Sequence, residues 1–169
     1  MNNNKMQLQL SPELAAKISK GVQRTLSSMF GITPVPQTVL IELDCKISAD
    51  ISGIVNLIQE REEGTFIVSF PSPVIFYILG RLYQKDFTCI DRSVEMGVGE
   101  ITNIIYGTVK SQLNESGMSL KMAIPNIILG HQHVILNLGQ RPTMVLPFAI
   151  ESGIFHILIT VYSEAERRT

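Results

Sequence analysis

The sequence at residues 91–117 reads DRSVEMGVGEITNIIYGTVKSQLNESG, and its spacing is that of one long helix. Asp91 or Ser93 can cap the start of this helix, and Gly117 is a typical residue just past its end. One side of the helix carries an apolar stripe at intervals of three and four residues, as expected for a face that packs on a core. The stripe consists of Val94, Val98, Ile101, Ile105, Val109 and Leu113.

The opposite side of this predicted helix carries, within an arc of roughly 60°, the residues Met96, Glu100, Asn103 and Gly107. Since the apolar stripe faces the core, Glu100 and Asn103 must point outward. Three glycines each weaken the helix by roughly 1 kcal/mol relative to alanine, which is expected where another backbone approaches closely; they are Gly97, Gly99 and Gly107. The sequence therefore predicts a helix face that meets a partner, with Met96, Gly99 and Gly107 as contact residues.

The composition predicts a single domain over residues 1–169, because 45% of the chain is hydrophobic and a chain of this length can bury a core. The net charge of -1 and the lack of a basic run give no support for nucleic-acid binding. The longest apolar run, Val74–Leu79, is too short to cross a bilayer, and Met1–Leu10 lacks an apolar signal region. We therefore expect no membrane association and a cytoplasmic location. Cys45 and Cys89 lack metal-ligand spacing, so we expect both to be buried, reduced thiols.

Two further helices and a series of strands are predicted around the long helix. The first helix begins with Ser11 as N-cap and Pro12 at its first position, and it ends at Gly31. The second begins at Ser72–Pro73 and is apolar nearly all round, so we expect it to be buried. A charged turn at 60–64 and a hairpin at 152–153 separate the strands, and the tail 163–169 should fray. Strands are expected at 38–48, 51–59, 65–70, 119–123, 126–129, 133–138, 143–150 and 155–162. This pattern predicts an α+β fold, with a mostly antiparallel sheet packed by three helices.

The motif Gly99-Glu100-Ile101-Thr102-Asn103 carries a resemblance to a known family. Together with the order of the elements, it resembles the CheX/CheC chemotaxis phosphatases and their Glu-x-x-Asn helix over nearly the whole chain. Pro125 lies about where the downstream family proline is expected, and Gly53 fits the family's glycine-bearing strand. CheC-type members carry two such helices, whereas the first helix here, Leu14–Phe30, contains no Glu-x-x-Asn. The chain therefore looks CheX-like, with a CheC-like fold and one site.

The resemblance implies hydrolysis of the aspartyl phosphate on a response-regulator receiver domain such as CheY. Asn103 would orient the attacking water without acting as a base, because a carboxamide can accept a hydrogen from water and donate to a phosphoryl oxygen. Glu100 would pair with the active-site lysine of the receiver and dock the helix. The receiver would supply Mg²⁺, so we expect no cofactor and no metal on this chain. CheX-like proteins resemble one another in pairing across the sheet, which implies a homodimer.

Simpler alternatives remain open for the helix face. Family members usually have Asp or Ser one turn before the glutamate, whereas this chain has Met96, which cannot hydrogen-bond to a partner in the same way. Met96 could equally pack against a neighbouring loop. Glu100 and Asn103 could form an ordinary solvated helix face. The chain could also be a non-catalytic binding module of the same fold, akin to flagellar-switch proteins such as FliY.

The three histidines favour structural roles. His131 and His133 could share a strand face as metal ligands, but no third Cys, His or carboxylate lies nearby in the sequence. We therefore expect an ordinary loop and strand pair. His156 lies in an apolar strand and is predicted to be a satisfied structural histidine.

Overall fold

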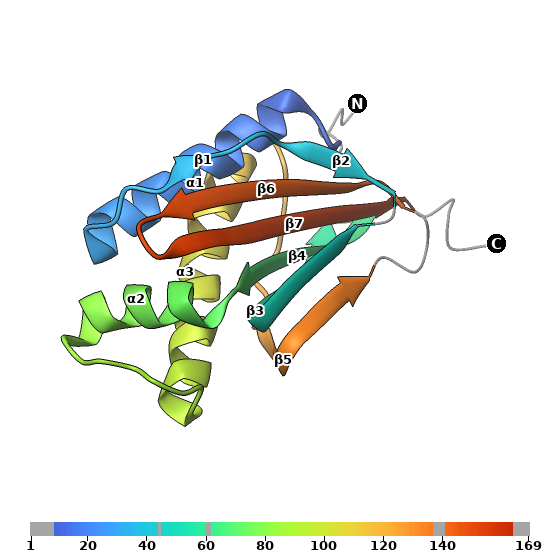
Figure 1. The fold of residues 1–169 in the computed structure, drawn as a ribbon. Helices are drawn as coiled ribbons and strands as arrows, with labels where there is room; N and C mark the ends of the chain where they lie inside the picture. The colour runs from blue at the N-terminus through green and yellow to red at the C-terminus, as the bar shows by residue number, and fades with distance from the viewer. Residues whose placement is uncertain (1–8, 44, 60–61, 137–140, 164–169) are drawn as a thin grey trace, which may run out of the picture.

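The computed structural model describes residues 9–43, 45–59, 62–136 and 141–163. Its elements are α1 (Pro12–Phe30), β1 (Val35–Pro36), β2 (Leu40–Glu42), β3 (Lys46–Gln59), β4 (Glu62–Phe70), α2 (Ser72–Tyr83), α3 (Arg92–Glu115), β5 (Asn126–Leu136), β6 (Thr143–Ile150) and β7 (Gly153–Ser163). The strands form one antiparallel sheet in the order β1-β6-β7-β4-β3-β5, and β2 also pairs with β6. Figure 1 shows α1 and α3 lying across one face of this sheet. The predicted α+β fold is therefore confirmed.

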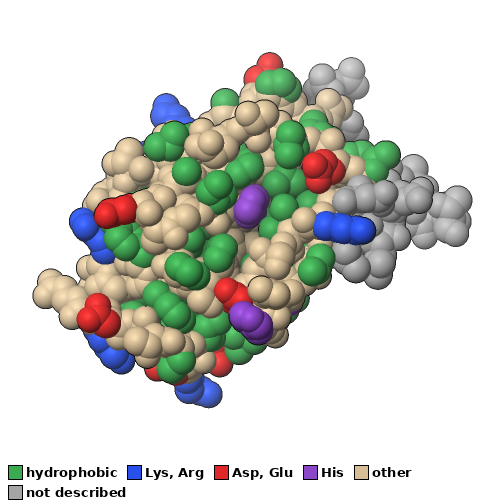
Figure 2. All heavy atoms as spheres, viewed as in Figure 1, with side chains coloured by type: hydrophobic (Ala, Val, Ile, Leu, Met, Phe, Trp, Pro, Cys, Tyr) green, Lys and Arg blue, Asp and Glu red, His purple; other side chains and the backbone are tan. Residues whose placement is uncertain are grey.

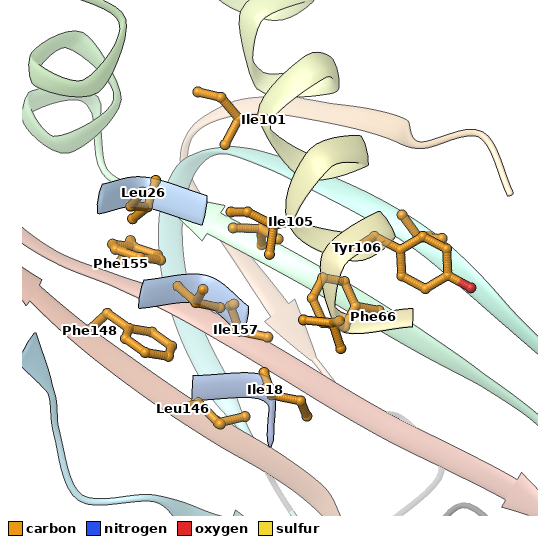
Figure 3. Close-up of a cluster of buried hydrophobic side chains, with 14 of the residues drawn as sticks. Ile18, Leu26, Phe66, Ile101, Ile105, Tyr106, Leu146, Phe148, Phe155 and Ile157 are labelled. Atoms are coloured by element: carbon orange, nitrogen blue, oxygen red, sulfur yellow. The ribbon is translucent and has the colours of Figure 1, made fainter. Parts of the chain in front are cut away.

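The main hydrophobic core lies between the helices and the sheet (Figure 3). Ile18 and Leu26 enter it from α1, Ile101 and Ile105 from α3, and Phe148 from β6. All six residues of the predicted apolar stripe on α3 are buried, so that prediction is confirmed. Because burial of this stripe fixes the inward side of α3, it also fixes which residues face out. Within the described residues, no helix combines the length and apolar character needed to cross a membrane.

The predicted ends of the helices are confirmed by their caps. Ser11 Oγ accepts a hydrogen bond from Leu14 N at 3.2 Å, and Gly31 adopts the left-handed conformation that ends α1. Asp91, rather than Ser93, caps α3, because Asp91 Oδ1 accepts from Val94 N at 3.0 Å. The start of α3 is thus determined by a local side-chain contact.

Two predictions near the start of the sheet were wrong in extent. The stretch 38–48 is not one strand, because only Leu40–Glu42 pairs with β6 and the central strand β3 starts at Lys46. Its apolar residue Ile41 is exposed rather than buried, since β2 is a short strand at the sheet edge. The charged turn is shorter than 60–64, because residues 62–64 already belong to β4. Residues 60–61 and the tail 164–169 lie outside the described residues.

The predicted strand at 119–123 does not form. Lys121 N donates to Ile58 O of β3 at 3.2 Å, but side chains of α3 bond the backbone of Leu120 and Lys121. Asn114 Oδ1 accepts from Leu120 N at 2.8 Å, and the Tyr106 hydroxyl donates to Lys121 O at 2.7 Å. The strands predicted at 126–129 and 133–138 are one continuous strand, β5, which ends at Leu136. Residues 137–140 lie outside the described residues.

The register between β3 and β5 shifts between Ala49 and Ile51, where Asp50 of β3 stands opposite residues 130–132 of β5, and this places Asp50 at a junction of three elements. Asp50 Oδ2 accepts from both the backbone N and the hydroxyl of Ser72, at 2.7 and 2.8 Å, at the start of α2. Asp50 Oδ1 accepts from Gln132 N at 3.0 Å in β5. Burial alone would raise the pKa of Asp50, but these hydrogen bonds and the nearby His131 lower it overall. The carboxylate therefore holds β3, α2 and β5 together in its charged form.

The second face of the sheet carries no helix within the described residues. Figure 2 shows hydrophobic side chains spread across it, with Lys and Arg side chains toward its periphery. A small cluster of Cys45, Ile67, Val145 and Leu158 is buried there, beside a hollow of about 370 Å³. Both cysteines are free, as predicted. However, only Cys45 is buried, and Cys89 is exposed because it lies in the connection between α2 and α3.

Candidate functional site

The outward face of α3 holds the residues that the sequence predicted for it. Glu100 and Asn103 are both exposed, one turn apart, and Met96 is 67% exposed one turn before Glu100. Gly107 is half-buried on this face one turn after Asn103, and Gly99 is half-buried on its flank. The structure therefore brings the predicted site residues together on one accessible surface.

Close packing of α3 on β3 sets the position of this face. A Cβ atom at Gly53 would overlap Thr102 Oγ1 and would lie 2.8 Å from Thr102 Cβ and Cγ2. Only glycine allows α3 to lie this close to the strand. Thr102 points inward, and its buried hydroxyl has no partner among the described residues. Since Thr102 lies next to Asn103, the Gly53 contact determines how far the carboxamide of Asn103 stands out from the sheet.

The sequence suggested that the glycines of α3 allow another backbone to approach closely, but the structure shows different surroundings at each of them. A Cβ at Gly97 would lie 2.6 Å from Leu79 Cδ2, so this glycine lets α2 of the same chain pack against α3. A Cβ at Gly99 would lie 3.8 Å from Ile127 Cδ1, which is ordinary contact. A Cβ at Gly107 would meet no atom within 4 Å. Gly107 alone therefore leaves open space on the outward face, and at Gly97 the close neighbour is a side chain rather than a backbone.

The two polar side chains differ in how they are held. Tyr83, the last residue of α2, donates a long hydrogen bond of 3.5 Å from its hydroxyl to Glu100 Oε2. Among the described residues, none bonds to the carboxamide of Asn103. A carboxamide offers two donors and an acceptor, so Asn103 can bind water and an oxyanion at the same time. Glu100 presents an acceptor to a cationic partner.

A hollow of about 310 Å³ lies beside Glu100, at the end of α3 nearest α2. We call it the aromatic hollow; it is lined by Tyr83, Lys85, Phe87, Ser93 and Met96. The rings of Tyr83 and Phe87 meet edge to face with centroids 6.3 Å apart, and Lys85 Nζ lies 5.1 Å from the centre of the Phe87 ring. The sequence reasoning missed this feature. Two aromatic residues at 83 and 87, near the otherwise polar connection 84–89, were the available signal.

The other flank of the site is the segment 118–125, which runs alongside α3. Tyr106 of α3 bonds to Lys121 O, and Ile127 lies near Gly99, so the segment passes Asn103 between these two contacts. Ile124 is 89% exposed on this segment. The polar pair Glu100 and Asn103 thus lies between the aromatic hollow and the segment 118–125.

The histidines lie away from this face. His131 Nδ1 lies 3.3 Å from Asp50 Oδ1, whereas His133 Nε2 shares a hydrogen bond of 2.8 Å with Ser52 Oγ. The two rings therefore have separate partners, and the part of the chain that the structure describes holds no group of three metal-ligating side chains. The prediction for His156 was wrong, because its buried Nδ1 has no hydrogen-bond partner among the described residues, and burial lowers the pKa of the ring.

Comparison with known proteins gives a consistent result. The model of a family described as chemotaxis phosphatase CheX matches residues 51–149, a span that includes Glu100 and Asn103. No curated protein matches the chain. Among solved structures, a CheC-like superfamily protein from Shewanella has a TM-score of 0.85 at 22% identity, covering 91% of this chain and 100% of its own. A chemotaxis protein CheX from Desulfovibrio desulfuricans has a TM-score of 0.80 at 26% identity, covering 89% and 99%. A CheX–CheY complex with BeF3 and Mg²⁺ from Borrelia burgdorferi has a TM-score of 0.73 at 19% identity, covering 88% and 97%.

Proposed function

This chain belongs to the CheX family of chemotaxis phosphatases, and from that premise we propose that it hydrolyses the aspartyl phosphate of a response-regulator receiver domain. The observation that carries the proposal is the pairing of Glu100 and Asn103, one turn apart and exposed on the outward face of α3. The Borrelia burgdorferi structure, in which a CheX is bound to CheY, supports a receiver as the partner. Such a reaction belongs in the cytoplasm, where response regulators work.

The proposed chemistry needs little from this chain beyond orientation. The oxygen of a water molecule attacks phosphorus, the bond from phosphorus to the aspartate oxygen breaks, and the products are the free carboxylate and inorganic phosphate. The carboxamide oxygen of Asn103 accepts a hydrogen bond from that water, and its NH₂ group donates one to a phosphoryl oxygen. Together these hold the water in line with the bond that breaks. Glu100 pairs with a lysine of the receiver and sets the position of Asn103. The receiver contributes Mg²⁺ for charge neutralisation, and this chain contributes no cofactor.

Replacement of Asn103 by alanine tests the proposal. Loss of one preorganised polar group costs about 2 to 4 kcal/mol of transition-state stabilisation, so Asn103→Ala should release phosphate roughly 30- to 1,000-fold more slowly. Purified receiver domains, phosphorylated with a small phosphate donor and Mg²⁺, supply the substrate for a phosphate-release assay. Asn56→Ala is the matched control, because Asn56 is an exposed asparagine on β3 away from α3. If Asn103→Ala keeps the wild-type rate, the proposed mechanism is wrong.

The exposed Met96 favours a second candidate function, a binding module that docks a receiver without turnover. A thioether offers an adaptable apolar contact but no hydrogen bond to the partner. A wild-type protein that binds receivers activated with beryllofluoride, yet accelerates no phosphate release from any phosphorylated receiver, would establish this function instead.

We also propose that the protein forms a homodimer. The sheet ends in two unpaired edges within the described residues, at β5 and at β1 with β2. The edge strand β5 carries apolar side chains that are close to half exposed, including Ile128, Leu129 and Val134. A second copy would cover an edge that otherwise offers unpaired backbone groups to any passing strand.

A further inference from the structure

The aromatic hollow has the composition of a contact pocket rather than of a catalytic one. Its walls are the rings of Tyr83 and Phe87 and the thioether of Met96. The one cation in its lining, Lys85, lies over the ring of Phe87, so its charge is held against an aromatic face. A side chain that enters the hollow therefore meets mainly carbon and sulfur atoms, which favours an apolar group.

The hollow and the polar pair form one continuous surface. Met96 lines the hollow and lies one turn before Glu100 on the same helix. Tyr83 lines the hollow and also donates to Glu100 Oε2. A partner whose cation pairs with Glu100 is therefore placed next to the hollow.

We propose that the aromatic hollow binds an apolar side chain of the receiver domain that Glu100 and Asn103 engage, and that Met96 thereby determines which receivers this protein accepts. The inference rests on the proposed function, because it names a second contact for the same partner.

Three observations favour a receiver over another occupant. The hollow adjoins the outward face of α3, so the same docking event covers both. Glu100 is exposed beside it and accepts from Tyr83 of its lining, so its carboxylate complements a partner that approaches with a lysine. Its volume of about 310 Å³ suits a side chain inserted from a protein surface. Apolar residues packed into such pockets commonly carry much of the binding energy of an interface.

Met96 offers a clean test because it is 67% exposed, so its truncation should leave folding intact. Met96→Ala removes the apolar wall, Met96→Leu preserves it, and Val35→Ala is a matched truncation at a 57% exposed residue on the edge strand β1. The probe is the receiver that loses phosphate fastest with the wild-type protein among a panel of purified receivers. Three quantities are measured: the KM and the kcat for phosphate release, and the Kd for the same receiver activated with beryllofluoride and Mg²⁺. The thermal midpoint of each variant confirms that it is folded.

For Met96→Ala, we expect KM and Kd to rise by about five- to tenfold, the effect of truncating a contact residue at an interface. Its kcat should change less than twofold, because Asn103 is untouched. Met96→Leu and Val35→Ala should stay within twofold of the wild type in Kd.

Two results would overturn the inference about the aromatic hollow and would leave the proposed phosphatase function intact. One is a Met96→Ala protein with wild-type Kd, while Asn103→Ala still slows phosphate release as expected. The other is a loss of self-association in Met96→Ala by light scattering, which would assign the hollow to a second copy of the chain. Failure of the proposed function looks different, because the wild-type protein would then accelerate phosphate release from no receiver, whether or not it binds one.

Discussion

Replacement of Gly53 by alanine should damage stability and activity together, although Gly53 lies on a strand behind the site helix. The new Cβ would overlap Thr102 Oγ1 and lie 2.8 Å from Thr102 Cβ and Cγ2, whereas ordinary contact begins at 3.4 Å. Helix α3 must therefore move outward by roughly 0.6 Å or more, the difference between these two distances. The strand cannot yield instead, because Gly53 pairs with Val68 on one side and Ile127 on the other.

Overpacking of this kind costs about 1 to 3 kcal/mol in the free energy of unfolding. The lower entropy of the unfolded alanine chain offsets roughly 0.5 to 1 kcal/mol of that cost. For activity, displacement of a positioned group by about 1 Å can cost on the order of 100-fold. We therefore expect Gly53→Ala to lose about 0.5 to 2 kcal/mol of stability in a urea titration. Since α3 moves by a large part of 1 Å, phosphate release should be about 10- to 100-fold slower.

Gly107→Ala is the control for the stability measurement, because no atom lies within 4 Å of the position of its new Cβ. The same substitution should stabilise α3 there by about 0.5 to 1 kcal/mol, so the two glycines should shift stability in opposite directions. Adding Thr102→Ala, which removes Oγ1 and Cγ2, should recover part of the loss in Gly53→Ala. A Gly53→Ala protein as stable and as active as the wild type would refute the claim that this contact positions the site.

Three further outcomes are expected. Glu100→Lys should weaken receiver binding by several kcal/mol through the meeting of two cations, and Glu100→Gln should weaken it less; a Glu100→Lys protein with normal Kd and turnover would remove this helix from the site. Asp50→Asn should lower the free energy of unfolding by about 1 to 3 kcal/mol. Because folding lowers the pKa of Asp50, this difference should be full above about pH 4 and should shrink as the pH falls further, as urea titrations at several pH values would show. Light scattering at tens of micromolar should give twice the chain mass of 18.8 kDa, and a value at the monomer mass would count against the homodimer.

Predictions from the sequence worked best where a single periodic pattern determined the outcome. The apolar stripe of α3 needs only its spacing to identify the buried side, so the exposure of Glu100 and Asn103 followed directly from it. The caps Ser11 and Asp91 were equally accessible, since each acts on its own neighbours in the chain.

Predictions failed where distant residues replaced the expected pairing. Residues 119–123 have the composition of a strand, but Asn114 and Tyr106 on α3 bond their backbone. The two strands expected at 126–129 and 133–138 are joined in β5, and the register with β3 shifts at residues 130–132, where Asp50, far away in the sequence, accepts a hydrogen bond from Gln132 N. The aromatic hollow depends on the fold in the same way, since it forms only when α2 packs against α3 at Gly97. Local periodicity contains none of this information.

The polar pair and the aromatic hollow are built by parts of the chain that tolerate change very differently. Asn103 adjoins Thr102, which is confined between the core and Gly53. Substitutions at this point therefore disturb the packing of α3 on β3. Tyr83 and Lys85 lie at the end of α2 and in the loop after it, where both are exposed and substitutions meet few neighbours. An evolving lineage could therefore exchange one signalling partner for another by changes in this loop, while the hydrolytic residues stay as they are. Paralogues in one cell could diverge in the same way, and pathways that share this fold could be insulated from one another at little cost to the scaffold.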